Sequence, residues 1–331
     1  MADSQTAKST PEFKSAHFIG IGGAGMSGIA LVLHERGYTV TGSDLKTSRY
    51  IRQLTRAGVK VHVGHEAATI DEVKPDVVVV STAIPESNPE LVRARELGIP
   101  VWPRAKMLSA LGHGYTTVAV AGTHGKTTTS SMCATMLDRM GLDPSFLIGG
   151  IVEGYDTNGK NGSGEYFVAE ADESDSSFLF LEPNVVVVTN VEADHLDHYS
   201  GIEEIEATFA KFMGLVGEDG TVKGLYAGSA TLRASYTAGE DPHLVELAKS
   251  TGRRVLSYGF AEANDIVCVH PDVTGIQSDF VVRFEDGTEH AVEIKSNPGR
   301  HNMLNATAVL TVAHVLGLDT DAAAKALSSF E

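Results

Sequence analysis

The sequence is poor in cysteine, in positive charge and in long apolar runs, and each shortage excludes a class of protein. Its two cysteines, Cys133 and Cys268, are too few for a disulfide framework and lie in no metal-binding pair, so we expect both to be reduced core thiols. No apolar run approaches the roughly 20 residues that span a bilayer, so no membrane segment is expected. The net charge of −17 disfavours a nucleic-acid partner, because such proteins need a basic face.

The remaining composition favours a soluble α/β protein of about two domains. The chain has 331 residues, of which 42% are hydrophobic and 34 are glycine. Residues 1–16 are polar and lack the basic and apolar regions of a secretory signal, so we expect a disordered lead-in there and a cytoplasmic location. The oligomeric state stays open between a monomer and a homodimer.

Residues 17–112 are predicted to form a Rossmann-like domain around a parallel sheet, because short apolar runs alternate there with helical patterns. Its expected strands are residues 17–21, 38–41, 76–80 and 100–102. Its expected helices are residues 24–36, 48–57, a segment opened by Asn88-Pro89, and 104–111.

Residues 113–331 are predicted to form a second α/β domain of the P-loop ATPase type. Its expected strands are residues 117–121, 166–169, 185–189, 280–284 and 290–294. A two-residue turn at Asp286-Gly287 is predicted between the last two strands, because both positions tolerate positive φ. Its expected helices are a segment ending at Met140, residues 300–316 and residues 321–329.

A glycine-rich run lies between the strand 117–121 and the helix that follows it. The run consists of Gly122, Thr123, His124, Gly125, Lys126, Thr127 and Thr128. Backbone amides in such a loop surround phosphate oxygens, a lysine reaches the β- and γ-phosphates, and a following hydroxyl binds Mg²⁺. Val120 occupies the first glycine position of the general pattern, and a plain strand-to-helix turn is the alternative. The Gly-Lys-Thr-Thr order favours ATP binding.

A second glycine run, residues 20–25, has the spacing G-x-G-x-x-G after the first strand, and Asp44 follows near the end of the second strand. Taken alone, this pattern indicates a nicotinamide dinucleotide. However, it reports only a close approach of backbone to a pyrophosphate, which a uridine diphosphate sugar also carries. The alternative is tight packing of a helix on a strand.

Acidic and histidine residues follow two strands of the second domain. Glu170, Asp172, Glu173 and Asp175 come after the strand 166–169, and a run of Asp194, His195, Asp197 and His198 comes after the strand 185–189. Beside a P-loop, carboxylate and imidazole groups can hold Mg²⁺ during phosphoryl transfer. The spacing does not decide which of the acids binds metal, and a solvated acidic loop is the alternative.

The segment Arg300 to Asn305 opens a helix and places His301 and Asn305 four residues apart on one face. Asparagine can pair with an adenine edge, but it also favours helix N-termini as a cap. From spacing alone, capping is the better interpretation.

Together, these segments resemble the Mur ligases, in the order in which that family carries them. The resemblance covers nearly the whole chain from His17 and rests on residues 19–28, 121–129, 169–175, 194–197 and 299–306. It implies an ATP-dependent ligase that joins L-alanine to the carboxylate of UDP-N-acetylmuramate through an acyl phosphate, a cytoplasmic step of peptidoglycan precursor synthesis.

The resemblance also implies roles for individual residues. Lys126 would bind the β- and γ-phosphates, and Thr127 and Glu170 would hold one Mg²⁺ and His195 a second. Of these, Lys126, Glu170 and His195 would be the catalytic residues. The residues implied to contact adenine are His301, Asn302 and Asn305. The residues implied to contact the uridine diphosphate sugar are Gly22, Gly23, Ala24, Gly25 and Met26, with Ser43, Asp44, Ser81 and Asn88 as weaker positional candidates.

Two family features are not assigned here. Several relatives use a carbamylated lysine as a metal ligand; Lys211 lies near that place, but the alanine-adding branch is not expected to have one. The family also carries a third domain that helps to bind the amino acid, and this chain is expected to lack it. We therefore expect the 331 residues to bind nucleotide without efficient ligation.

Three other functions remain open at this point. A muropeptide-recycling relative would add a tripeptide instead of alanine. A nicotinamide oxidoreductase would explain the first glycine run but leave Lys126 and Thr127 without a task. A nucleotide-sugar sensor would bind both ligands and never hydrolyse ATP.

Overall fold

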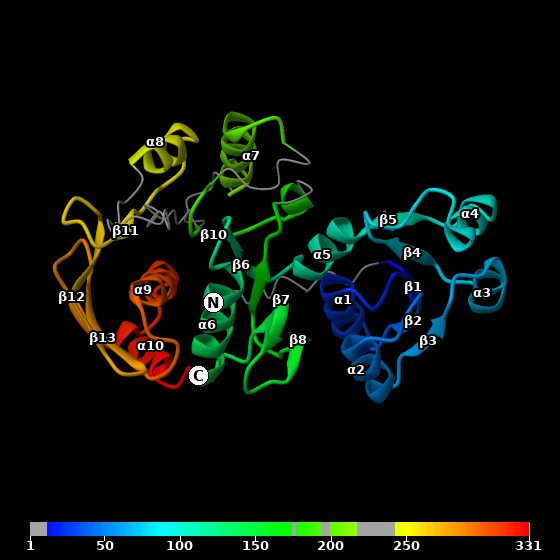
Figure 1. Cartoon of the computed structure of the whole chain (residues 1–331), viewed down its shortest axis with the longest axis horizontal. Coiled ribbons are helices and arrows are strands. Elements are labelled where there is room, and N and C mark those ends of the chain that lie inside the picture. The colour runs from blue at the N-terminus through cyan, green and yellow to red at the C-terminus, as the bar shows by residue number, and fades with distance from the viewer. Residues whose placement is uncertain (1–11, 174–176, 193–198, 217–241, 331) are drawn as a thin grey trace, which may run out of the picture. The chain divides into compact units, whose positions relative to one another are not determined.

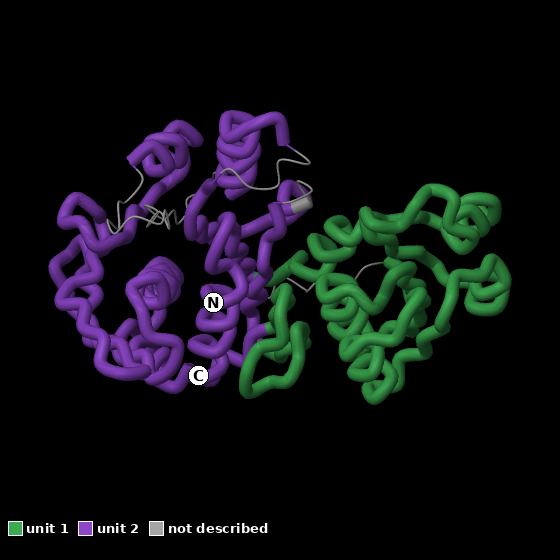
Figure 2. Tube along the Cα trace, in the orientation of Figure 1, with its two compact units in different colours: residues 1–115, 145–163 green, residues 116–144, 164–331 purple. Residues whose placement is uncertain are grey.

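The computed structural model describes residues 12–173, 177–192, 199–216 and 242–330. The chain divides into two compact units, which Figure 2 shows in different colours. Unit 1 comprises residues 1–115 and 145–163, and unit 2 comprises residues 116–144 and 164–331. The predicted boundary between residues 112 and 113 is close to the first crossing. No sequence pattern predicted that residues 145–163 would belong to unit 1.

Unit 1 contains a parallel sheet with the strand order β3-β2-β1-β4-β5. Its strands are β1 (Ser15–Ile19), β2 (Thr39–Asp44), β3 (Lys60–Val63), β4 (Val77–Val80) and β5 (Val101–Pro103). Two valines of β4, Val78 and Val79, are fully buried, as a strand covered on both faces requires. The edge strand β3 and helix α3 (Ala67–Val73) were not predicted, because neither shows a buried face long enough to produce a pattern.

The other helices of this sheet are α1 (Ala24–Glu35), α2 (Arg49–Ala57), α4 (Pro89–Glu96) and α5 (Arg104–Gly112). Side-chain caps and glycine fix the ends of two of these helices. The Ser48 hydroxyl caps α2, and Gly58 ends it at a φ of 100°. The Asn88 side chain accepts hydrogen bonds from the amides of Glu90 and Leu91 at the start of α4.

A hairpin of β7 (Ser145–Val152) and β8 (Thr157–Lys160) belongs to unit 1 and packs on α1. The contact is close because two glycines face each other: a Cβ on Gly159 would lie 2.8 Å from the Gly28 carbonyl oxygen. Asn158 is 1% exposed, and its amide donates to the Ala24 carbonyl and, over 3.2 Å, to the Ser27 hydroxyl. The hairpin is therefore held against the first turn of α1.

Unit 2 contains three neighbouring parallel strands in the order β10-β6-β9. They are β6 (Thr116–Ala121), β9 (Tyr166–Glu170) and β10 (Val185–Val188). Helix α6 (Lys126–Arg139) follows β6 and packs on β6 and β9. Helix α7 (Ile202–Gly214) places Phe209 and Phe212 against Phe178 of the short 3₁₀ helix η1 (Ser177–Phe180). Helix α8 (Pro242–Ser250) packs on α7.

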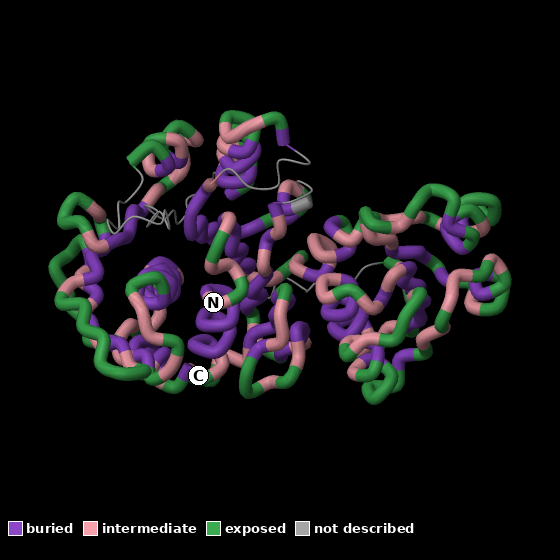
Figure 3. Tube along the Cα trace, viewed as in Figure 1, coloured by how far each residue is buried: buried purple, intermediate pink, exposed green. Residues whose placement is uncertain are grey.

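Unit 2 also contains a four-stranded sheet of β11 (Tyr258–Gly259), β12 (Ile266–Thr274), β13 (Gln277–Arg283) and β14 (Glu289–Ile294). Helices α9 (Arg300–Val315) and α10 (Thr320–Leu327) contact this sheet and also α6 (Figure 1). Helix α9 is buried along most of its length (Figure 3), which explains why its apolar and small polar residues are not confined to one face. These two helices therefore lie between the four-stranded sheet and α6, which in turn packs on β6 and β9.

The predicted two-residue turn at Asp286-Gly287 is wrong. Only Gly287 has a positive φ, at 83°, and the amide of Phe284 donates to the Thr288 carbonyl. Three residues therefore form the loop, and the Asp286 side chain instead accepts hydrogen bonds from the amide and hydroxyl of Thr288.

No helix in the described part of the chain combines the length and apolarity needed to cross a bilayer.

Removing the Asn158 side chain is expected to destabilise unit 1 by about 1–3 kcal/mol, because Asn158→Ala deletes a buried amide that satisfies two groups at the start of α1. Urea unfolding followed by the fluorescence of Trp102, the only tryptophan, measures this in unit 1. Thr55→Ala, which removes one local hydrogen bond of an exposed residue of α2 in the same unit, is the control and is expected to change stability by less than about 0.5 kcal/mol. Equal effects of the two variants would contradict this account.

Candidate nucleotide-binding site

The loop between β6 and α6 has the conformation that a phosphate-binding loop requires. Gly122 has a φ of 132° and Gly125 a φ of 86°, which only glycine adopts without strain. Gly125 is the N-cap of α6 and forms no side-chain cap. The first amides of α6 therefore point toward the loop with the positive end of the helix dipole, an arrangement that binds anions.

The loop is held by two residues at the end of β10, Thr189 and Asn190. The Asn190 side chain accepts from the His124 amide over 2.8 Å and donates to the His124 carbonyl over 2.8 Å. The Thr189 hydroxyl donates to the same carbonyl over 2.6 Å. Sequence reasoning missed both residues. The only available signal was that they follow an apolar strand directly, where side chains of a parallel sheet converge on the loop.

Lys126 lies at the start of α6, and its ammonium group turns back into the loop. Its Nζ donates to the carbonyls of Gly122 and Thr123, over 2.5 and 3.3 Å, and lies 2.8 Å from Oε1 of Glu173. The Glu173 side chain is 3% exposed. Burial raises the pKa of the Glu173 carboxyl, and the opposing effect of Lys126 is too small to cancel it.

Thr127 and Glu170 come from different elements and meet beside Lys126. The Thr127 hydroxyl donates to Oε1 of Glu170, at the end of β9, over 3.1 Å. A hydroxyl and a carboxylate are the hard oxygen donors that Mg²⁺ prefers, so this pair fits the predicted metal site. The third predicted ligand, His195, lies outside the described residues. Within the described ranges, no three histidine, cysteine, aspartate or glutamate side chains form a metal-binding group.

The predicted adenine segment lies next to this loop. Asn305, in the second turn of α9, has its Oδ1 3.1 Å from the position that a Cβ on Gly125 would occupy. Asn305 and Asn302 are buried, and the Asn305 amide donates to Asn302 Oδ1 over 3.0 Å. His301 is exposed. Neither asparagine is the N-cap, which is Gly299, so the capping interpretation of these residues is wrong.

The first glycine run also forms a tight strand-to-helix turn, now in unit 1. Gly20 has a φ of 81°, and the amides of Gly20 and Ile21 both donate to the Ser43 carbonyl. The Gly22 amide donates to Oδ2 of Asp44 over 2.9 Å. The run then enters α1 after Gly23, which forms no side-chain cap. Asp44 therefore lies at the loop, as predicted from its position.

The other positional candidates of unit 1 differ in their surroundings. The Ser43 side chain is fully buried and bonds to His65 and Glu90, so it supports the loop from behind and offers its hydroxyl to no ligand. The Asn88 side chain caps α4. The Ser81 hydroxyl accepts from the Ala83 amide. A direct ligand contact from the Ser43 side chain is therefore not supported.

The network around Ser43 is a buried acid with three polar neighbours. Burial alone would raise the pKa of the Glu90 carboxyl, but hydrogen bonds with Ser43 and His65, and the His17 imidazole 3.7 Å from Oε1, outweigh this effect and hold the pKa below its ordinary value. Ser43 and Glu90 both meet His65 at Nδ1, over 2.9 and 3.1 Å, so the three do not form a relay for nucleophilic catalysis. The network stabilises the strand end that holds the glycine run.

Arg104, the first residue of α5, lies over the first glycine run. Its Nη1 is 2.4 Å from the position that a Cβ on Gly25 would occupy, so only a glycine there allows the approach. Sequence reasoning missed Arg104, because it lies 79 residues from Gly25 and outside every motif. It places a guanidinium beside the N-terminus of α1, where the helix dipole also favours an anion.

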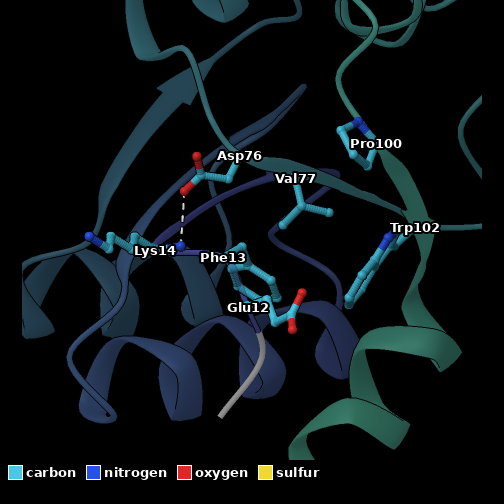
Figure 4. A pocket seen from close by; sticks show the side chains of 7 residues that line it. All are labelled: Glu12, Phe13, Lys14, Asp76, Val77, Pro100 and Trp102. Atoms are coloured by element: carbon cyan, nitrogen blue, oxygen red, sulfur yellow. Dashed lines mark hydrogen bonds between the residues drawn. The ribbon is translucent and has the colours of Figure 1, made fainter.

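A pocket in unit 1 lies at the amino ends of β1, β4 and β5, whereas the first glycine run lies at the carboxyl end of β1 (Figure 4). Its lining residues are Glu12, Phe13, Lys14, Asp76, Val77, Pro100 and Trp102. The Asp76 carboxylate bonds to the amides of Lys14 and Ser15, which holds the pKa of that carboxyl below its usual range. The first glycine run follows the carboxyl end of β1, so within unit 1 this pocket is separate from that run.

The fold and the two loops define a P-loop protein with an added Rossmann-like unit. Comparison with known families agrees: residues 15–116 match the model of the Mur ligase family, catalytic domain, and residues 120–313 match that of the Mur ligase middle domain. The chain belongs to the Mur ligase family.

Named relatives are longer than this chain. The chain is 45% identical over 316 residues to the UDP-N-acetylmuramate–L-alanine ligase of Halorhodospira halophila, covering 95% of this chain and 62% of that protein. It is 42% identical over 320 residues to the ligase of the same name from Pelobacter propionicus, covering 96% and 66%. The chain thus spans less than two thirds of these relatives.

Two solved structures are also similar. The UDP-N-acetylmuramate-alanine ligase MurC from Thermotoga maritima has a TM-score of 0.79 and 28% identity, covering 96% of this chain and 68% of that one. The UDP-N-acetylmuramate:L-alanyl-gamma-D-glutamyl-meso-diaminopimelate ligase from Neisseria meningitides has a TM-score of 0.82 and 30% identity, covering 96% and 98%.

Gly122→Ala is expected to weaken ADP binding by about tenfold or more, because its Cβ would lie 2.1 Å from the Thr189 hydroxyl and push the loop off β10. Calorimetric titration with ADP measures the effect. Gly214→Ala, near the end of α7, is the matched control, since its Cβ would meet nothing within 4 Å. Unchanged ADP affinity in Gly122→Ala would show that the loop does not bind the nucleotide.

Proposed function

We propose that this protein is an ATP-dependent ligase that joins L-alanine to the carboxylate of UDP-N-acetylmuramate. The observation that carries the proposal is the convergence of Lys126, Thr127 and Glu170 at the loop between β6 and α6. An ammonium group, a hydroxyl and a carboxylate placed together in this way are the groups that phosphoryl transfer uses. The names of the relatives, and a separate anion-binding loop in unit 1, support the sugar acid as the acceptor.

The reaction has two balanced steps. A carboxylate oxygen of UDP-N-acetylmuramate attacks the γ-phosphorus, and the bond to ADP breaks. The amine of L-alanine then attacks the carbonyl carbon of this acyl phosphate, phosphate leaves, and the amine loses a proton. The Lys126 ammonium would donate to the β- and γ-phosphate oxygens and stabilise the charge that moves onto ADP. Glycine-loop amides would hold the same phosphates.

Thr127, Glu170 and His195 are proposed as the residues that hold Mg²⁺. When bound, the metal would neutralise charge on the phosphate oxygens. For this to occur, the Thr127 hydroxyl must exchange its hydrogen bond with Glu170 for the metal. Adenine contacts are proposed for His301, Asn302 and Asn305, because Asn305 lies beside Gly125.

The uridine diphosphate is proposed to bind at residues 22–26 in unit 1, with Asp44 at the same loop. We add Arg104 to this site, because its guanidinium beside Gly25 would balance the diphosphate charge. Ser81 and Asn88 remain candidates at neighbouring strand ends. Ser43 would act through its carbonyl, which holds the amides of Gly20 and Ile21.

The complete protein is expected to form ADP and phosphate only when UDP-N-acetylmuramate and L-alanine are both present. Mass spectrometry should identify UDP-N-acetylmuramoyl-L-alanine as the product. Parallel reactions with other amino acids and with the tripeptide L-alanyl-γ-D-glutamyl-meso-diaminopimelate test the acceptor. Turnover with the tripeptide and none with L-alanine would overturn the assignment.

Arg104→Ala is expected to raise the KM for UDP-N-acetylmuramate by roughly tenfold or more, since a charge-assisted hydrogen bond to the diphosphate is lost. Gly25→Ala should have a similar effect, because its Cβ displaces the guanidinium. Arg52→Ala, an exposed arginine of α2 in the same unit, is the matched control. The KM for ATP should stay unchanged in all three variants. An unchanged KM for UDP-N-acetylmuramate in Arg104→Ala would show that Arg104 does not bind this substrate.

A further inference from the structure

Glu173 lies in the nucleotide site and has no task in the reaction described above. It follows β9 by three residues, its side chain is 3% exposed, and Oε1 lies 2.8 Å from the Lys126 ammonium. Its backbone carbonyl accepts a hydrogen bond from the hydroxyl of the buried Tyr199. The carboxylate is therefore held in place by contacts on both its side chain and its backbone.

The Lys126 ammonium has three N–H donors, and all three have acceptors in this structure. Two acceptors are loop carbonyls, those of Gly122 and Thr123, and the third is Glu173. A phosphate oxygen can reach the ammonium only if one acceptor gives way. Glu173 is the acceptor that must yield, because the two carbonyls are part of the loop and a carboxylate repels a phosphate of like charge.

We propose that Glu173 is a positioning residue that takes the place of the nucleotide's terminal phosphates at Lys126 and is displaced when ATP or ADP binds. The inference rests on the proposed function of the loop. In the empty loop, the carboxylate keeps Lys126 directed toward the phosphate site. In the occupied loop, the same carboxylate competes for Lys126, so it lowers nucleotide affinity and favours release of ADP.

The position of Glu173 makes its effect specific for the outer phosphates. Lys126 is proposed to reach the β- and γ-phosphates, which ATP and ADP have and AMP lacks. Substitution of Glu173 should therefore change the affinity for ATP and ADP and leave that for AMP unaltered. A residue that only maintained the fold of the site would affect all three nucleotides alike.

Calorimetric titration of the complete protein with ATP, ADP and AMP, in EDTA and then in MgCl₂, tests the inference. Glu173→Gln, of nearly equal size and without the charge, should bind ATP and ADP at least about tenfold more tightly and AMP as before. Glu165→Gln removes the same charge from an exposed residue at the amino end of β9 and is the matched control, with an expected change below about twofold. Unchanged or weaker ADP binding by Glu173→Gln would overturn the inference.

A double-mutant cycle locates the effect at Lys126. In a Lys126→Met background, Glu173→Gln should give a much smaller gain in ADP affinity, because the ammonium for which the groups compete is gone and only the direct repulsion between carboxylate and phosphate is relieved. An equal gain with and without the lysine would contradict the proposed competition. If the unsubstituted protein binds no ADP, the proposed function itself fails; if it binds ADP and Glu173→Gln gives no gain, only the role of Glu173 fails.

A second variant covers the case in which Glu173→Gln does not fold. Glu173→Asp keeps the charge and withdraws the carboxylate by one methylene from Lys126. It should raise ADP affinity by a smaller factor, with AMP again unaffected. Circular dichroism and thermal unfolding establish that each variant is folded, and no gain in a folded Glu173→Asp would then count against the inference.

Discussion

The attachment of the phosphate-binding loop to the end of β10 is the constraint on which the nucleotide site depends. Asn190 bonds to both the amide and the carbonyl of His124, and Gly122 fits against Thr189 only because it has no side chain. With the loop fixed in this way, the first turn of α6 brings Lys126 and Thr127 to Glu173 and Glu170. In the strand order β10-β6-β9, Thr189 and Asn190 follow the strand on one side of β6, and Glu170 and Glu173 come from the strand on the other side.

In a chain with a net charge of −17, the anion binding that we propose depends on local arrangements. The loop of unit 2 combines backbone amides, a helix N-terminus and one lysine. The loop of unit 1 combines the same backbone features with Arg104. In each loop an acid lies against the binding elements: Glu173 at Lys126, and Asp44 at the Gly22 amide. Because an ion pair is weakest where both ions are solvated, the burial of Glu173 makes its competition with phosphate strong.

Much of the fold was predictable because its signals are local. Glycine at Gly58, capping by Ser48 and Asn88, and the buried valines of β4 act within a few residues of their position. The failures have equally physical causes. The strand β3 lies at a sheet edge and lacks a continuous apolar run. The length of the loop at Gly287 is set by the hydrogen bonds between Phe284 and Thr288 and not by the Asp286-Gly287 pair.

The amino-acid sequence alone predicted the two glycine loops, their place between strand and helix, and a nucleotide site at Lys126 and Thr127 with acidic residues at a neighbouring strand end. These follow from backbone restrictions and from the convergence of parallel strand ends. Four contacts became visible only in the folded chain: Asn190 supports the loop, Arg104 lies over Gly25, the Ser43 side chain is buried, and Glu173 is paired with Lys126. Each of these contacts joins residues more than 20 positions apart, and burial and distance between such residues arise only when the whole chain packs.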